Sequence, residues 1–107
     1  MELNQYYIVL VNLDPTIGSE IKKTRPCVII SPNEMNWHLQ TIVLAPMTTN
    51  TKNYPTRVAV ELNSMKGMIV LDQIRTVDKS RILKIIGQLN PTQIATCKSI
   101  IRETYVD

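Results

Sequence analysis

The sequence has no phenylalanine, and it has only one tryptophan, four tyrosines, one histidine, two cysteines and three glycines. With so few aromatic rings, the core must be built from Ile, Val and Leu, which favour β-strands. Two cysteines with one histidine are too few for the usual four-ligand metal site, so no metal is expected. Because Cys27 and Cys97 lie in apolar stretches, buried free thiols are expected rather than a disulfide.

Long hydrophobic runs are also missing. No segment approaches the roughly 20 apolar residues of a membrane span, and Met1–Asn4 lacks the basic segment that begins a signal peptide. We therefore expect a soluble, cytoplasmic protein with no membrane partner. A chain of 107 residues with 44% hydrophobic content predicts one ordered domain spanning residues 1–107.

Charge is only mildly unbalanced, with 12 basic and 9 acidic residues and a net charge of +3. This excess does not by itself indicate a nucleic-acid partner. The basic residues are grouped, however: Lys22, Lys23 and Arg25 fall in one polar segment, and Lys52 and Arg57 in another. Solvated loop charge is the alternative interpretation of both groups.

Apolar, β-branched segments predict six short strands. Pro46 is expected to end the third of them, and Gly87 predicts a bend or bulge in the last. Residues 32–38 are expected to be irregular, 47–55 a long loop, 63–67 a turn and 72–77 an extended segment. The predicted strands are residues 6–13, 26–31, 41–45, 57–61, 67–71 and 81–89.

The C-terminal segment predicts a helix of about residues 91–105. Asn90 provides an N-cap, Pro91 suits the first helical position, and Gln93 completes a capping box. Ile94, Cys97, Ile101 and Tyr105 then recur on one face at helical spacing. Short strands followed by one helix indicate a mainly β fold with α, in which a small twisted barrel packs against the helix.

Arg25-Pro26 is the pair with the clearest chemical potential. Proline fixes the backbone next to the arginine, and an apolar strand follows at once. We therefore expect the guanidinium to be held at the start of a rigid strand. A guanidinium matches phosphate geometry and keeps its charge at any working pH. A surface ion pair with Glu20 is the alternative role.

Cleavage of RNA by its own 2′-hydroxyl needs a proton acceptor, charge stabilisation at phosphorus and a donor to the leaving oxygen. Glu20, Arg25, Thr48 and Thr49 offer these groups, and the single histidine excludes a two-histidine mechanism. Each has a plainer alternative, which for Thr48 is turn capping. Asp72 could also accept a proton, and its alternative role is a structural hydrogen bond or a pair with Arg75. His38 and its neighbour Trp37 could contact a base, and their alternative role is that of exposed loop residues.

Several separated blocks follow one another over nearly the whole chain: Asp14-Pro15, Gly18-Ser19-Glu20, Arg25-Pro26, Val28–Pro32, Pro46-Met47-Thr48-Thr49, Tyr54-Pro55 and Asp72–Asp78. In their residues and their order these blocks resemble the MazF/PemK toxins. In the Kid branch of that family an arginine stands two residues before the Asp-Gln pair, where this chain has Val70, so Arg25 is expected to carry more of the charge stabilisation.

The resemblance implies an SH3-like small barrel with a C-terminal helix, acting as a homodimer without metal or cofactor. It implies cleavage of single-stranded RNA, mostly mRNA, leaving a 2′,3′-cyclic phosphate or 3′-phosphate and a 5′-hydroxyl. It also implies a MazE-like antitoxin that threads a disordered acidic segment across the dimer groove. Arg25 and Thr48 match the catalytic pair, and Glu20 matches the carboxylate.

We therefore expect Arg25 to stabilise charge at the phosphorus, Thr48 to donate a hydrogen bond there, and Glu20 to act as general base. Asp72 is the other candidate base, and the role of His38 stays open, as do the RNA word and the antitoxin's binding mode. The candidate RNA-binding residues are Ser19, Lys22, Lys23, Thr49, Asn50, Lys52, Asn53, Tyr54, Asp72 and Gln73.

Two other functions are compatible with a small barrel. A CcdB-like toxin that poisons DNA gyrase resembles this fold but carries an aromatic C-terminal tail, whereas this chain ends Thr104-Tyr105-Val106-Asp107. An SH3-like adaptor needs a groove lined with aromatic side chains, and this chain has few. The Arg-Pro and Thr-Thr blocks favour the nuclease.

Overall fold

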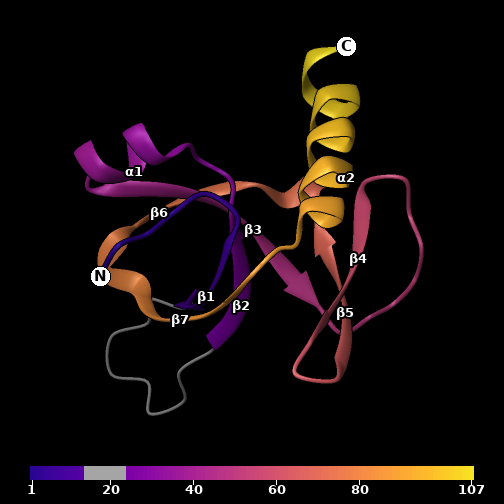
Figure 1. The fold of residues 1–107 in the computed structure, drawn as a ribbon, viewed down its shortest axis with the longest axis horizontal. Coiled ribbons are helices and arrows are strands. Elements are labelled where there is room, and N and C mark those ends of the chain that lie inside the picture. The colour runs from indigo at the N-terminus through magenta and orange to yellow at the C-terminus, as the bar shows by residue number, and fades with distance from the viewer. Residues whose placement is uncertain (14–23) are drawn as a thin grey trace.

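The computed structural model describes residues 1–13 and 24–107. In this part of the chain an antiparallel sheet of seven strands curls into a half-barrel, and one long helix packs beside it (Figure 1). The strand order is β4-β5-β3-β2-β1-β7, with β6 paired to β3. The strands are β1 (Tyr7–Asn12), β2 (Thr24–Ile29), β3 (Thr41–Thr48), β4 (Arg57–Leu62), β5 (Met65–Val70), β6 (Arg75–Asp78) and β7 (Ile82–Gln88).

Two hydrophobic cores lie on the two faces of this sheet. The barrel core is formed by β1, β2, β3, β6 and β7, and it includes Val9, Cys27 and Leu44, all fully buried. The outer core lies between the opposite face, the β4–β5 hairpin and the helix α2 (Pro91–Ile101), and it includes Val28, Ile69 and Cys97. Side chains alternate between the faces of a strand, so neighbouring residues such as Cys27 and Val28 belong to different cores.

The C-terminal helix confirms the prediction made from its capping sequence. The Asn90 side chain accepts a hydrogen bond from the Gln93 amide, and the Gln93 side chain accepts one from the Asn90 amide. After Ile101 the helix continues as a π-helical turn, Arg102–Val106. The Tyr105 hydroxyl donates a 2.6 Å hydrogen bond to the carbonyl of Leu71, which ties the end of the helix to the sheet.

Several strand boundaries and one helix differ from the sequence prediction. The second strand begins at Thr24, so Arg25 lies inside it and pairs with Val11 of β1. Residues 33–38 were expected to be irregular, but they form the helix α1 (Asn33–His38). The buried Asn36 amide donates to the Ser31 carbonyl and its oxygen accepts from the Ser31 hydroxyl, and this contact stabilises the helix.

The prediction that Pro46 ends the third strand is wrong, because β3 continues to Thr48. On one side, β3 pairs with β6 up to Leu44 and with β5 from Met47 onwards. Pro46 therefore falls where β3 changes partner, a position at which the missing backbone N–H breaks no ladder.

The segment 63–78 also differs in detail. The predicted turn of five residues is a tight turn at Asn63 and Ser64, whose φ angles are 51° and 68°. The strand after it therefore starts at Met65 rather than Gly67. The segment expected to be extended contains the 3-10 helix η1 (Leu71–Gln73) before β6. The irregularity expected at Gly87 is confirmed as a register shift between its pair and the next one along β1.

Candidate active site

The pairing of β2 with β3 brings Arg25 and Thr48 to the same place. The register pairs Cys27 with Pro46, Val28 with Ala45 and Ile29 with Leu44. Continued by two residues to the ends of the strands, this register sets Arg25 opposite Thr48. Residues facing each other across an antiparallel pair have β-carbons about 5 Å apart. The ladder itself ends at Cys27 and Pro46, and the small hollow lined by both Pro26 and Thr48 supports the proximity of the two residues singled out from the sequence.

Both side chains are directed to the face that bears the barrel core. Arg25 alternates with Cys27 and Ile29 along β2, and Thr48 alternates with Leu44 and Ile42 along β3. Those four inner positions are buried, whereas Arg25 is exposed and Thr48 half-buried. The cluster therefore stands at one end of the barrel, where the apolar interior gives way to solvent.

Arg75 adds a second cation to this end of the barrel. It is the first residue of β6 and pairs with Leu44, so its side chain lies on the same face as that of Leu44. Burial raises the pKa of the Cys27 thiol, and both Arg25 and Arg75 lie close enough to it to oppose this rise. The sequence had suggested Arg75 only as a partner for Asp72; its alternation with the buried Val77 was the signal of its true direction.

The two cysteines are buried free thiols, as predicted. Burial raises the pKa of Cys27 to about 12, and this outweighs the opposing effect of the two arginines. Burial also raises the pKa of Cys97 to about 11. Both thiols therefore stay protonated at neutral pH and have no thiolate to act as nucleophile.

The loop after β3 is ordered by local contacts around Thr48. The Thr48 hydroxyl accepts a hydrogen bond from the Asn50 amide, and the Asn50 side chain accepts one from the Lys52 amide. Thr48 therefore makes the turn contact considered as its alternative role, and its hydrogen remains available as a donor. Residues 49–54 are exposed.

Tyr54 forms the outer anchor of the same loop. Its ring lies 4.8 Å from the Arg57 guanidinium carbon and 5.5 Å from the Lys52 ammonium nitrogen, measured to the ring centroid. Stacking against these cations holds the ring in place while 42% of the residue stays exposed. The residue therefore stays accessible at the surface, where an aromatic ring can contact a base.

Asp72 and Gln73 belong to η1, beyond the end of β5. The Asp72 carboxylate accepts a 2.9 Å hydrogen bond from the Thr56 hydroxyl, which matches the structural role considered for it. Among residues 1–13 and 24–107 the one ion pair is Arg102 with Asp107, so no pair joins Asp72 to Arg75. His38 and Trp37 lie in α1, which follows the opposite end of β2 from Arg25. Ser19, Glu20, Lys22 and Lys23 lie outside the described residues.

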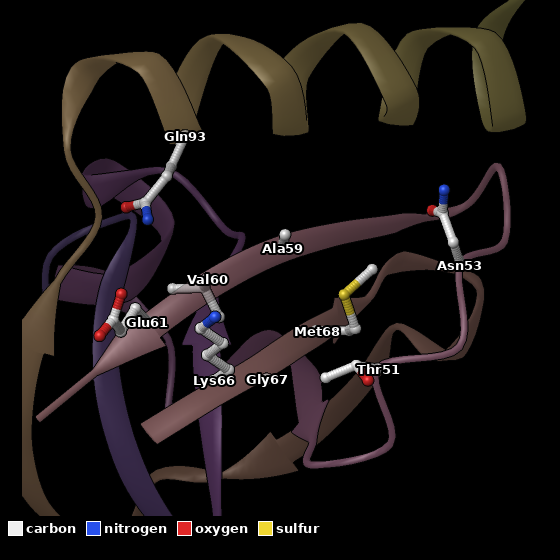
Figure 2. A pocket seen from close by; sticks show the side chains of 9 residues that line it. All are labelled: Thr51, Asn53, Ala59, Val60, Glu61, Lys66, Gly67, Met68 and Gln93. Carbon is white, nitrogen blue, oxygen red and sulfur yellow. The ribbon is translucent and has the colours of Figure 1, made fainter. Parts of the chain in front are cut away.

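A hollow of about 530 Å³ lies on the outer surface of the β4–β5 hairpin, below the start of α2 (Figure 2). Of the predicted RNA-binding residues that the structure describes, only Asn53 lines this hollow. The other lining residues were not predicted, because they come from four separate segments and carry no shared motif. The lining residues are Thr51, Asn53, Ala59, Val60, Glu61, Lys66, Gly67, Met68 and Gln93.

Comparison with known proteins identifies the family. The model of the PemK-like, MazF-like toxins of type II toxin–antitoxin systems matches residues 4–105. The chain belongs to this family. A curated relative, endoribonuclease MazF of Staphylococcus saprophyticus, is 32% identical over 100 residues, covering 88% of this chain and 83% of the relative.

Solved structures of MazF proteins share the fold of this toxin. The Mycobacterium tuberculosis toxin MazF-mt6 superposes with a TM-score of 0.78 at 23% identity, covering 91% of this chain and 93% of that one. A MazE–MazF structure from Deinococcus radiodurans gives a TM-score of 0.79 at 22% identity, covering 96% and 95%. Within the described part of this toxin, no helix is both long and apolar enough to cross a membrane.

Gly67 allows β5 to approach the backbone of Thr48. A β-carbon built on Gly67 would lie 2.9 Å from the Thr48 carbonyl oxygen, closer than real contacts allow. On the other side of the hairpin, Gly67 and Lys66 also line a smaller hollow of about 160 Å³ with Pro26 and Thr48. The absence of a side chain at Gly67 therefore helps to set the position of Thr48.

Replacing Gly67 with alanine is expected to destabilise the toxin by about 1–3 kcal/mol, the usual cost of overpacking, and to lower its activity by displacing Thr48. Thermal unfolding and RNA cleavage measure the two effects. Gly87→Ala is the matched control, because its β-carbon would meet only the side-chain tips of Leu62 and Ile8, at 3.2 and 3.6 Å. Equal losses in the two variants would show that the contact with Thr48 is not special.

Proposed function

We propose that this toxin is a sequence-specific endoribonuclease that cleaves single-stranded RNA, chiefly mRNA, without a metal and so inhibits translation and growth. The observation that carries the proposal is the register of β2 and β3, which pairs Cys27 with Pro46 and, extended by two residues, supports a position of Arg25 opposite Thr48. The family match and the relative named as an endoribonuclease support it. Arg75 on the same face supplies further positive charge for a phosphate backbone.

In the proposed reaction, the 2′-hydroxyl of the RNA attacks the adjacent phosphorus, and the bond to the 5′-oxygen breaks. The products are a 2′,3′-cyclic phosphate, which opens to a 3′-phosphate, and a 5′-hydroxyl. Arg25 stabilises the extra negative charge on the phosphoryl oxygens, and Thr48 donates a hydrogen bond to the same group. Glu20 takes the proton of the 2′-hydroxyl, and solvent water gives a proton to the departing 5′-oxygen. Asp72 is the weaker candidate base, since its carboxylate is engaged by Thr56.

The proposal extends to specificity and to partners. An exposed loop next to Thr48 carries Thr49, Asn50, Lys52, Asn53 and Tyr54. Unpaired bases are recognised by their edges and faces, and we expect this loop to contact them. The active form is a homodimer, and a cognate MazE-like antitoxin covers the groove. The solved MazE–MazF structures from Deinococcus radiodurans and a mycobacterial endoribonuclease bound to its antitoxin support the second part.

The test is incubation of the purified toxin with a long single-stranded RNA in excess EDTA. We expect a small number of discrete fragments whose new 5′ ends accept phosphate from polynucleotide kinase without prior phosphatase treatment. The Arg25→Ala variant, purified in parallel, controls for contaminating ribonuclease. Intact RNA, or fragments that appear equally with the variant, would refute the proposal, and inhibition of gyrase without RNA cleavage would indicate the CcdB-like function instead.

A further inference from the structure

One residue that lines the hollow in Figure 2, Met68, is the cross-strand neighbour of Thr48. Thr48 pairs with Met68 of β5, and Met68 pairs in turn with Ala59 of β4. Residues in one cross-strand row share a face of the sheet, so Thr48, Met68 and Ala59 form a continuous strip. Met68 and Ala59 line the hollow. This strip offers a polymer whose scissile group lies at Thr48 a short path to the hollow.

The chemistry of the hollow suits an unpaired base. Its volume of about 530 Å³ falls within the range of small-ligand sites, roughly 300–1,000 Å³. Ala59 and Met68, which share one face of the hairpin, provide an apolar floor on which a planar ring can stack. The polar groups around them are the side-chain amides of Asn53 and Gln93 and the charged groups of Glu61 and Lys66. Glu61 and Lys66 are cross-strand neighbours on β4 and β5. Amide and carboxylate groups of this kind are those that read base edges.

Gln93 occupies a special position at the edge of the hollow. Its oxygen is fixed by the Asn90 amide in the capping box, at 2.9 Å. Figure 2 shows its side chain extending from the helix toward β4. Because the oxygen is held, the rotation of the amide is restricted, and its nitrogen is presented to the hollow as a donor. A fixed donor discriminates between base edges better than a rotating one.

We infer that this hollow is a base-binding subsite for the nucleotide next to the cleaved bond, and that the Gln93 amide nitrogen selects among bases there. This inference rests on the proposed function. It adds α2 and the outer face of β4 and β5 to the loop residues already considered for RNA recognition.

Gln93→Glu tests the selection directly. Glutamate also serves in a capping box, so the helix start is retained while the donor nitrogen becomes an acceptor oxygen. The measurement is kcat/KM on a set of RNAs that differ by one base at each position within three nucleotides of the cut. We expect the preference at one position to change by about tenfold or more, with thermal stability unchanged or slightly increased.

Thr92→Glu is the control, because it adds the same charge to the same helical turn at an exposed residue outside the hollow. It should slow cleavage of every RNA by the same factor. A Gln93→Glu profile identical to that of Thr92→Glu, with wild-type toxin cutting at discrete sites, would overturn this inference and leave the proposed function intact. If the wild-type toxin makes no cuts at all, the proposed function fails and the inference with it.

Discussion

Replacing Arg25 with alanine is expected to lower kcat/KM for RNA cleavage by at least about 100-fold while the protein remains folded. Removal of one preorganised group that stabilises transition-state charge usually costs a factor of about 10²–10³. The side chain is exposed at the end of the barrel, so its loss leaves no cavity in the core. Single-turnover cleavage of a defined RNA, together with thermal unfolding, separates the catalytic effect from any loss of stability.

Two further variants sharpen this test. Arg25→Lys keeps the charge but loses the two-pronged geometry, so it should recover only part of the activity. Arg102→Ala removes one positive charge from an arginine that is 73% exposed and pairs with Asp107, and it should leave cleavage nearly unchanged. Cleavage by Arg25→Ala at close to the wild-type rate would remove Arg25 from the mechanism.

Replacing Thr48 with valine is expected to lower kcat by about 100-fold, with a smaller effect on substrate binding. Valine has nearly the same shape, so the change removes the hydroxyl and little else. The hydroxyl is lost both as a donor to the phosphoryl group and as the acceptor for the Asn50 amide. Separate kcat and KM values distinguish the two losses, since a donor used mainly in the transition state affects kcat.

Thr48→Ser retains the hydroxyl and should keep most of the activity. Thr41→Val makes the same chemical change at the exposed first residue of β3 and should have no effect. If Thr48→Ser loses as much activity as Thr48→Val, the methyl group matters rather than the hydroxyl, and the assignment of Thr48 as a donor is wrong.

Features of the fold that depend on local sequence were predictable. The capping box at Asn90 and Gln93 fixes the start of α2 without tertiary help, and the strand cores follow from apolar, β-branched runs. The errors lie where distant partners decide the structure. Pro46 is tolerated because β3 changes partner there, and α1 depends on the buried contact between Ser31 and Asn36.

The candidate site likewise has parts that the sequence could predict and parts that it could not. Arg25 and Thr48 were identified from motifs, and only the pairing of β2 with β3, extended by two residues, relates their positions, which no single segment reveals. The hollow was not foreseen, because Asn53, Lys66 and Gln93 come together only through the hairpin and the helix. Gln93 had been noticed only as a capping residue. A side chain with one obvious structural role gives no sequence signal of a second.

The change of partner at Pro46 has a mechanical consequence. The first residues of β3 pair with β6 of the barrel, and its last two pair with β5 of the hairpin. One continuous strand therefore connects the two halves of the molecule. Thr48 lies just past this junction, on the hairpin side, while Arg25 is carried by the barrel. A small rotation of one half against the other would change the spacing between the hydroxyl and the guanidinium. A molecule that binds the hairpin can therefore change the alignment of Arg25 and Thr48 without contacting either side chain.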